Sequence, residues 1–131
     1  MDRQQMNEYL ESIGGLKNGF YNDRPPIKNA NFFSVDQGWY PLIKDLIDDL
    51  IKLGWNKQVC QVKEKFGGLR FYINEGSNKI YERITQAEND SYKICEATGK
   101  PGELRTDLGW HTTLCDEEYE KRKKRNENRR V

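Results

Sequence analysis

The clearest pattern of hydrophobic and polar positions in the chain lies between Trp39 and Leu53. Apolar residues recur there every three or four positions, which places them on one face of a helix, while lysines and aspartates fall largely on the opposite face. The apolar positions are Trp39, Leu42, Ile43, Leu46, Ile47, Leu50 and Leu53. Pro41 suits a first helical turn and Gly54 suits a helix end. The pattern therefore predicts an amphipathic core helix.

After this helix the pattern changes from a helical period to a strand period. Two runs of alternating apolar and polar residues flank Gly67-Gly68, and their apolar positions are Cys60, Val62, Phe66, Leu69, Phe71 and Ile73. A glycine pair between two such runs is typical of a β-hairpin, because glycine readily adopts the positive φ that tight turns need. We expect a hairpin that turns at Gly67-Gly68 and packs its apolar side on the core helix.

Two more helices are predicted on either side of this core. Ser77 suits the N-cap of a helix whose apolar stripe consists of Ile80, Ile84, Ala87, Ser91 and Ile94. A short N-terminal helix is predicted before Gly14-Gly15, with one face made by Met6, Leu10 and Ile13. These elements predict an α+β fold, in which amphipathic helices pack on a β-hairpin or small antiparallel sheet.

The length of 131 residues suits one small domain with a single modest core. We expect this domain to cover residues 1–120, followed by a basic tail over 121–131. Within the domain, we expect an N-terminal helix and loop over 1–36, a helix–hairpin–helix core over 37–94 and a cysteine-containing loop over 95–118.

The sequence predicts neither a membrane segment nor a disulfide framework. No apolar run approaches the roughly 20 residues needed to cross a bilayer, and the opening MDRQQMNEYLE lacks the apolar stretch of a signal peptide. The three cysteines, Cys60, Cys95 and Cys115, are an odd and sparse set for disulfides. We therefore expect free thiols, a cytoplasmic location and no membrane partner.

The net charge of +1 hides an uneven distribution. Residues 119–131 contain seven basic and two acidic side chains, whereas the rest of the chain is mildly acidic. Such a basic segment can attract nucleic acid or another polyanion. A terminal basic run is more often a solvated, frayed helix end, so both interpretations stay open.

Catalytic chemistry is not indicated by the sequence. The chain has a single histidine, His111, and no recognisable serine or cysteine nucleophile motif. Asp45, Asp48 and Asp49 cluster on the polar side of the predicted core helix, where carboxylates are most simply solubilising charges. We therefore expect a non-enzymatic protein.

The segment CEATGKPGEL…GWHTTLCDEE is arranged like a small zinc ribbon, with a cysteine, a turn rich in glycine and proline, a tryptophan and a second cysteine. Together with GWYPLIKDLIDDLIKLGW and QVKEKFGGLRFYI, it resembles a widespread family of small bacterial and bacteriophage proteins. The resemblance covers roughly residues 38–119. The family has no settled biochemical function, so the resemblance bears mainly on architecture.

The resemblance also implies a zinc site that is incomplete in this chain. Many relatives carry Cys-x-x-Cys and Cys-x-x-His, the spacing of a tetrahedral zinc site. Cys95 and Cys115 match that pattern, whereas Thr98 replaces a cysteine and Glu118 replaces a histidine. We expect a degenerate zinc-ribbon-like loop without a metal cofactor. A zinc site made by Cys95, His111, Cys115 and Glu118 is the alternative.

The outer face of the predicted hairpin is the candidate binding site. Strand alternation directs four side chains outward when the apolar residues face inward: Lys63, Lys65, Arg70 and Tyr72. The backbone amides of Gly67 and Gly68 would lie beside them, where they could approach an anion. Arginine can bind phosphate through two hydrogen bonds and tyrosine can stack on a base. The set suits a phosphate-bearing ligand, and an ordinary solvated strand face is the alternative.

Two functions follow from these observations. The first is non-enzymatic binding of a nucleotide or other phosphorylated small molecule. Because the resembling family includes phage proteins, one concrete form of this function is a counter-defence protein that sequesters a host nucleotide signal in the host cytoplasm. A homo-oligomer could complete its binding pocket. The second is an adaptor derived from a zinc ribbon, which binds nucleic acid or a protein through the basic tail and depends steeply on salt. We favour the first.

Overall fold

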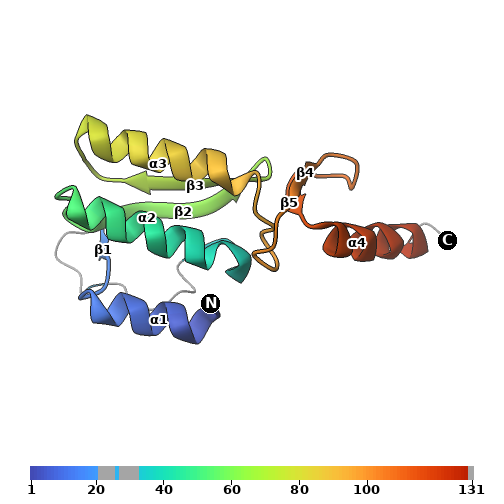
Figure 1. The fold of residues 1–131 in the computed structure, drawn as a ribbon, viewed down its shortest axis with the longest axis horizontal. Helices are drawn as coiled ribbons and strands as arrows, with labels where there is room; N and C mark the ends of the chain where they lie inside the picture. Colours follow the sequence, from blue (N-terminus) through green and yellow to red (C-terminus); the bar gives the residue numbers. More distant parts are fainter. Residues whose placement is uncertain (21–25, 27–32, 130–131) are drawn as a thin grey trace.

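A computed structural model of the chain describes residues 1–20, 26 and 33–129 (Figure 1). The helices in this part are α1 (Arg3–Ser12), α2 (Tyr40–Lys52), α3 (Asn78–Ser91), α4 (Asp116–Arg129) and the short 3-10 helix η2 (Gln37–Trp39). The strands are β1 (Lys17–Asn18), β2 (Gln58–Lys65), β3 (Gly68–Ile73), β4 (Glu103–Arg105) and β5 (Thr112–Leu114). The predicted α+β fold is confirmed. Within the described residues, no helix is both long and apolar enough to span a bilayer.

Helix α2 is the predicted core helix. With the adjoining Trp39, its buried side chains are Tyr40, Ile43, Leu46, Ile47 and Leu50. Tyr40 is not part of the predicted stripe, and Leu42, which belongs to it, is only half-buried. Pro41 lies in the first turn, and Gly54 follows the helix with φ of 91°. Leu53 is 41% exposed, because it lies beyond the last helical residue and leaves the buried stripe. The pattern thus identified the buried face of α2.

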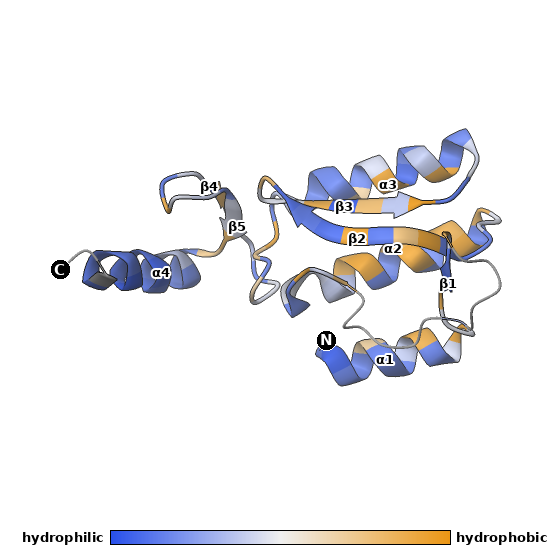
Figure 2. Cartoon of the chain, turned by 180° about the vertical axis from the view of Figure 1, so that it is seen from behind, coloured by the Kyte–Doolittle hydropathy of each residue, from blue (hydrophilic) through white to orange (hydrophobic). Residues whose placement is uncertain are grey.

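Strand β2 lies in the middle of a three-stranded sheet, parallel to β1 and antiparallel to β3. Val62 pairs with Phe71, and both side chains are buried in the main core with α2 and α3. A register shift between Val59 and Gln61 leaves Cys60 out of the simple alternation. Figure 2 views the hairpin from behind, and no helix crosses in front of β2 and β3 on this side.

The hairpin turns one residue earlier than predicted. The last strand pair is Lys65 with Gly68, so the two turn residues are Phe66 and Gly67, with φ of 53° and 86°. Positive φ at both central residues is typical of a tight hairpin turn. Gly68 belongs to β3, where an added Cβ would lie 2.3 Å from Cζ of Tyr92. Phe66 is 67% exposed, so the prediction that it faces the core is wrong.

Helix α3 closes the open edge of β3. The backbone N–H of Leu69 donates to Oγ of Ser91 over 2.8 Å, and the N–H of Phe71 donates to Oε2 of Glu88 over 3.0 Å. Unpaired strand edges invite pairing with other chains, and these side chains occupy that edge. The predicted N-cap, Ser77, is confirmed. The helix ends at Ser91, so Ile94, the last residue of the predicted stripe, lies beyond it.

The polar face of α2 contacts helices on both sides. Asp48 accepts a hydrogen bond from the Tyr9 hydroxyl of α1 over 2.6 Å and pairs with Lys44 over 2.9 Å. Asp49 pairs with Arg83 of α3 over 2.7 Å. The prediction that these two aspartates are only solubilising charges is therefore wrong. Helical periodicity identifies the polar face but does not reveal that other helices lie against its flanks.

The C-terminal part has a small core of its own, made by Cys95, Leu108, Leu114 and Cys115. Strands β4 and β5 pair antiparallel, and α4 follows and extends away from the rest of the chain (Figure 1). Helix α4 includes residues 121–129, so the predicted boundary at residue 120 falls inside a helix. The Thr113 hydroxyl donates to the carbonyl of Gly67 over 2.7 Å, which joins β5 to the tip of the hairpin.

Candidate functional site

The register of the hairpin brings the predicted polar side chains to one face. Lys63 lies directly opposite Arg70, and Gln61 lies opposite Tyr72. The ammonium nitrogen of Lys63 is 5.8 Å from the centroid of the Tyr72 ring, a cation–π contact. Tyr72 is 39% exposed, and Lys65 is exposed at the end of β2. The four side chains therefore form a cationic face with one accessible aromatic ring, here named the hairpin face (Lys63, Lys65, Arg70 and Tyr72).

None of the three cations of the hairpin face forms an ion pair with a carboxylate in the described part of the chain. The Arg70 guanidinium instead donates to the carbonyl of Leu69 over 2.9 Å and to the Tyr92 hydroxyl over 3.3 Å. The hydrogen bond to Tyr92 is the main cause that raises the pKa of Arg70, and together with smaller effects of Glu88 and Tyr72 it outweighs desolvation, which lowers the pKa. Arg70 is thus held in place and stays charged.

The hairpin turn does not offer the anion-binding amides that the sequence suggested. The N–H of Gly67 already donates to Oε1 of Glu64 over 2.6 Å, so a carboxylate of the chain occupies it. Both glycines are buried. An added Cβ at Gly67 would lie 2.4 Å from Cδ1 of Leu104. The glycines allow the C-terminal hairpin and Tyr92 to pack closely, and the prediction of a free amide at Gly67 is wrong.

In the cysteine loop, a threonine hydroxyl contacts the sulfur atom of one of the two cysteines. Cys95 and Cys115 are both buried, and the Thr98 hydroxyl lies 3.7 Å from the Cys115 sulfur, to which it donates. Burial alone would raise the pKa of Cys95, but hydrogen bonds from Thr98 and from the backbone N–H groups of Ala97, Thr98 and Cys115 lower it. Thr98 thus contacts a sulfur from the position where a second cysteine would bind a metal.

The alternative set of zinc ligands is not assembled. Among the residues that the structure describes, no three histidine, cysteine, aspartate or glutamate side chains are grouped so as to hold a metal. The exposed His111 ring packs edge-on against Phe66, with ring centroids 6.4 Å apart. Glu118 pairs with Lys121 over 3.7 Å. Whether the protein carries zinc in solution stays a prediction, which chelation can test.

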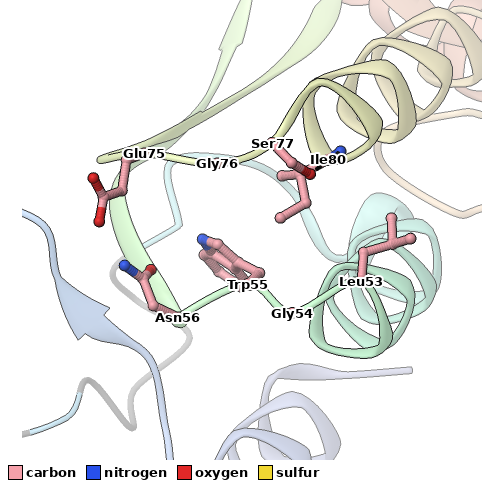
Figure 3. A pocket seen from close by; sticks show the side chains of 8 residues that line it. All are labelled: Leu53, Gly54, Trp55, Asn56, Glu75, Gly76, Ser77 and Ile80. Carbon is pink, nitrogen blue, oxygen red and sulfur yellow. Dashed lines mark hydrogen bonds between the residues drawn. The ribbon is translucent and has the colours of Figure 1, made fainter.

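A pocket of about 360 Å³ lies between the segment that follows α2 and the start of α3 (Figure 3). It is lined by Leu53, Gly54, Trp55, Asn56, Glu75, Gly76, Ser77 and Ile80. The indole nitrogen of Trp55 is buried and has no hydrogen-bond partner in the described part of the chain. Glu75 is the one charged residue of this lining, so the pocket does not suit a phosphate. None of the predicted site residues lines it.

Several residues that shape the candidate sites gave no signal in the sequence. Tyr92 holds Arg70 from 22 positions away, and Glu64 occupies the turn amide. Alternation assigns strand faces but does not reveal such partners. No protein-family model, curated protein or solved structure matches the chain. Function is therefore inferred from its own side chains, and the resemblance to the bacterial and phage family stays a prediction.

Proposed function

We propose that the chain binds a phosphate-bearing ligand, a nucleotide or another phosphorylated small molecule, on the hairpin face without altering it chemically. One observation supports this most directly: Lys63 and Arg70 lie directly opposite each other, and neither has a carboxylate partner among the described residues. Like charges at directly opposed strand positions destabilise a sheet. A bound phosphate between the two cations removes that repulsion.

Each side chain of the hairpin face has a distinct role in this proposal. The Tyr92 hydroxyl and the Leu69 carbonyl hold the Arg70 guanidinium, so little side-chain freedom is lost when phosphate binds. Lys63 and Lys65 add charge on the neighbouring strand. The partly exposed Tyr72 ring offers a surface on which a nucleobase stacks. The set thus recognises both halves of a nucleotide.

The hairpin face is a strand surface, and it contacts a ligand from one side. A second copy of the chain, facing the first, encloses the ligand more fully, which suits a homo-oligomer. The resemblance to phage proteins suggests one biological setting, sequestration of a host nucleotide signal.

Calorimetric titration of a nucleotide panel, including cyclic dinucleotides and ADP-ribose derivatives, tests the proposal. Arg70→Ala removes charge-assisted hydrogen bonds to phosphate and is expected to weaken binding by roughly 10- to 150-fold. Lys79→Ala is the matched control, because Lys79 is an exposed lysine on α3. Failure of every nucleotide to bind the wild type, or equal affinities of the Arg70 and Lys79 variants, would refute the proposal.

Lys63→Glu separates binding from folding. The new carboxylate would lie opposite Arg70 and replace repulsion by attraction, so the melting temperature is expected to stay the same or rise. Nucleotide binding is expected to be lost, because a negative charge then occupies the phosphate position. A variant that is stable and still binds as the wild type does would place the ligand elsewhere.

A further inference from the structure

A second surface of interest lies where the loop between β4 and β5 meets α4. Trp110 in this loop is 48% exposed, whereas Trp39 and Trp55 are buried. A hollow of about 260 Å³ is lined by Trp110, Arg122, Arg125 and Asn126. Tryptophan side chains are mostly buried in folded proteins, so a half-exposed indole beside two guanidinium groups is unusual.

Helix α4 is attached to the loop and is not a free tail. Asn126 donates to the carbonyl of Leu108 over 3.0 Å, and the Tyr119 hydroxyl donates to the Asp107 carboxylate. These contacts lie at both ends of a two-turn stretch of α4. Arg122 and Arg125, which lie between Tyr119 and Asn126, are therefore held beside Trp110 in a defined orientation.

The charges of α4 are separated along the helix. Its first turn is acidic, with Asp116, Glu117 and Glu118, where negative charge interacts favourably with the helix dipole. The cations follow as one run, Lys121, Arg122, Lys123, Lys124 and Arg125. Arg122 and Arg125 form no ion pair with any carboxylate in the part of the chain that the structure describes. Both guanidinium groups are thus available to an external anion.

We infer that Trp110, Arg122 and Arg125 form a binding surface for single-stranded nucleic acid. A base stacks on the exposed indole while the two guanidinium groups contact neighbouring phosphates. Single strands are favoured over duplexes, because stacking between neighbouring base pairs hides the base faces from Trp110. An acidic peptide would satisfy the arginines but would gain little from the flat indole. This inference concerns different residues from the hairpin face and does not depend on nucleotide binding there.

The test uses the full chain and a labelled single-stranded oligonucleotide of about 12 nucleotides, within the usual range of site sizes. Anisotropy gives the affinity, and quenching of intrinsic tryptophan fluorescence reports stacking. Because Trp39 and Trp55 are buried, the quenching is expected to come from Trp110 and to vanish in Trp110→Ala. The same variant is expected to bind about 5- to 150-fold more weakly.

Paired variants test the arginines. The double variant Arg122→Gln and Arg125→Gln is expected to lower the slope of log affinity against log salt by about 1.4, the value for two phosphate contacts on a single strand. Lys121→Gln is the matched control, since Lys121 lies on the same helix and pairs with Glu118. Circular dichroism and melting temperature check that each variant is folded.

Five outcomes would overturn the inference. The first four are no binding of the oligonucleotide to the wild type, unchanged affinity in Trp110→Ala, equal affinity for a duplex of the same length, and equal binding of a poly-glutamate peptide. An equal loss in the Lys121 control would indicate general charge attraction and would also overturn it. Lys79→Ala, which lies outside both surfaces, is expected to leave oligonucleotide affinity unchanged. The oligonucleotide is tested with variants of α4 and Trp110 and the nucleotide panel with variants of the hairpin face, so failure here and failure of the nucleotide proposal are distinguishable.

Discussion

Removing the hydroxyl of Tyr9 tests the contact between α1 and the polar face of α2. In Tyr9→Phe, the Asp48 carboxylate loses the hydrogen bond that it accepts over 2.6 Å. Hydrogen bonds to charged groups contribute about 1.5–3 kcal/mol, but the Asp48 side chain is 34% exposed and solvent weakens the contact. We therefore expect the free energy of unfolding to fall by about 1 kcal/mol. Tyr81→Phe is the control, because Tyr81 is 46% exposed on α3.

The effect of Tyr9→Phe also has a defined pH dependence. Burial alone would raise the pKa of Asp48, but hydrogen bonds from Lys44 and Tyr9 lower it below its ordinary value. A carboxyl group whose pKa is lower in the folded state stabilises the fold at pH values above its unfolded pKa, which is about 3.9 for aspartate. This stabilisation disappears as the pH falls through the folded pKa. The gap between wild type and variant is thus expected to be constant from pH 7 to pH 5 and to shrink below about pH 4.

Urea melts of wild type, Tyr9→Phe, Asp48→Ala and the double variant measure this interaction as a coupling energy. Equal stabilities of the Tyr9 and Tyr81 variants would refute the reasoning. So would a Tyr9 effect that is unchanged when Asp48 is already alanine, because the hydroxyl would then act through another group.

Two further predictions concern the C-terminal part. Burial raises the pKa of Glu96, and the Asp36 and Glu64 carboxylates add to this effect, while the Asp36 N–H and Arg122 lower it. A raised pKa means that ionised Glu96 destabilises the fold. The melting temperature of Glu96→Gln is therefore expected to exceed that of the wild type at pH 7 and to equal it near pH 4, and thermal melts at both pH values test this. Incubation with a chelator is expected to leave the melting temperature unchanged, because no set of three metal-binding side chains is assembled in the described residues; elemental analysis that finds about one zinc per chain would contradict this.

The main core could be predicted from the sequence because its signals are local. The apolar stripe of α2 and the alternation around Val62 and Phe71 each arise within a few residues, and both lie as expected. The exact turn could not be predicted in this way. Gly68 lies in β3, where the ring of Tyr92, 24 positions away in the sequence, fills the space beside it. Alternation alone does not distinguish a turn at Gly67-Gly68 from one that begins a residue earlier.

The candidate site shows the same division between local and long-range signals. Alternation placed Lys63, Arg70 and Tyr72 on one face, because a strand has a fixed period of two. The amide of Gly67 is occupied by Glu64, only three positions away, but alternation does not reveal which donor a carboxylate binds. The attachment of α4 to the β4–β5 loop arises from Asn126 and Leu108, which are 18 positions apart. The basic segment consequently looked like a free tail, although Asn126 and Tyr119 hold it against that loop.

Both proposed binding surfaces contain cations that form no ion pair in the described part of the chain, as do other lysines such as Lys52 and Lys79. Cations that have carboxylate partners within 4.0 Å are Lys44, Arg83, Lys100, Arg105 and Lys121. A shortage of carboxylates does not explain why the hairpin face and the two arginines beside Trp110 lack them, because the chain has 21 acidic residues against 22 basic ones. In both places the unpaired cations adjoin an exposed aromatic ring, Tyr72 or Trp110. Unpaired cations beside an exposed aromatic ring, found at both surfaces, favour a ligand that carries both phosphate and a planar base. Salt is expected to weaken the binding of such a ligand at either surface.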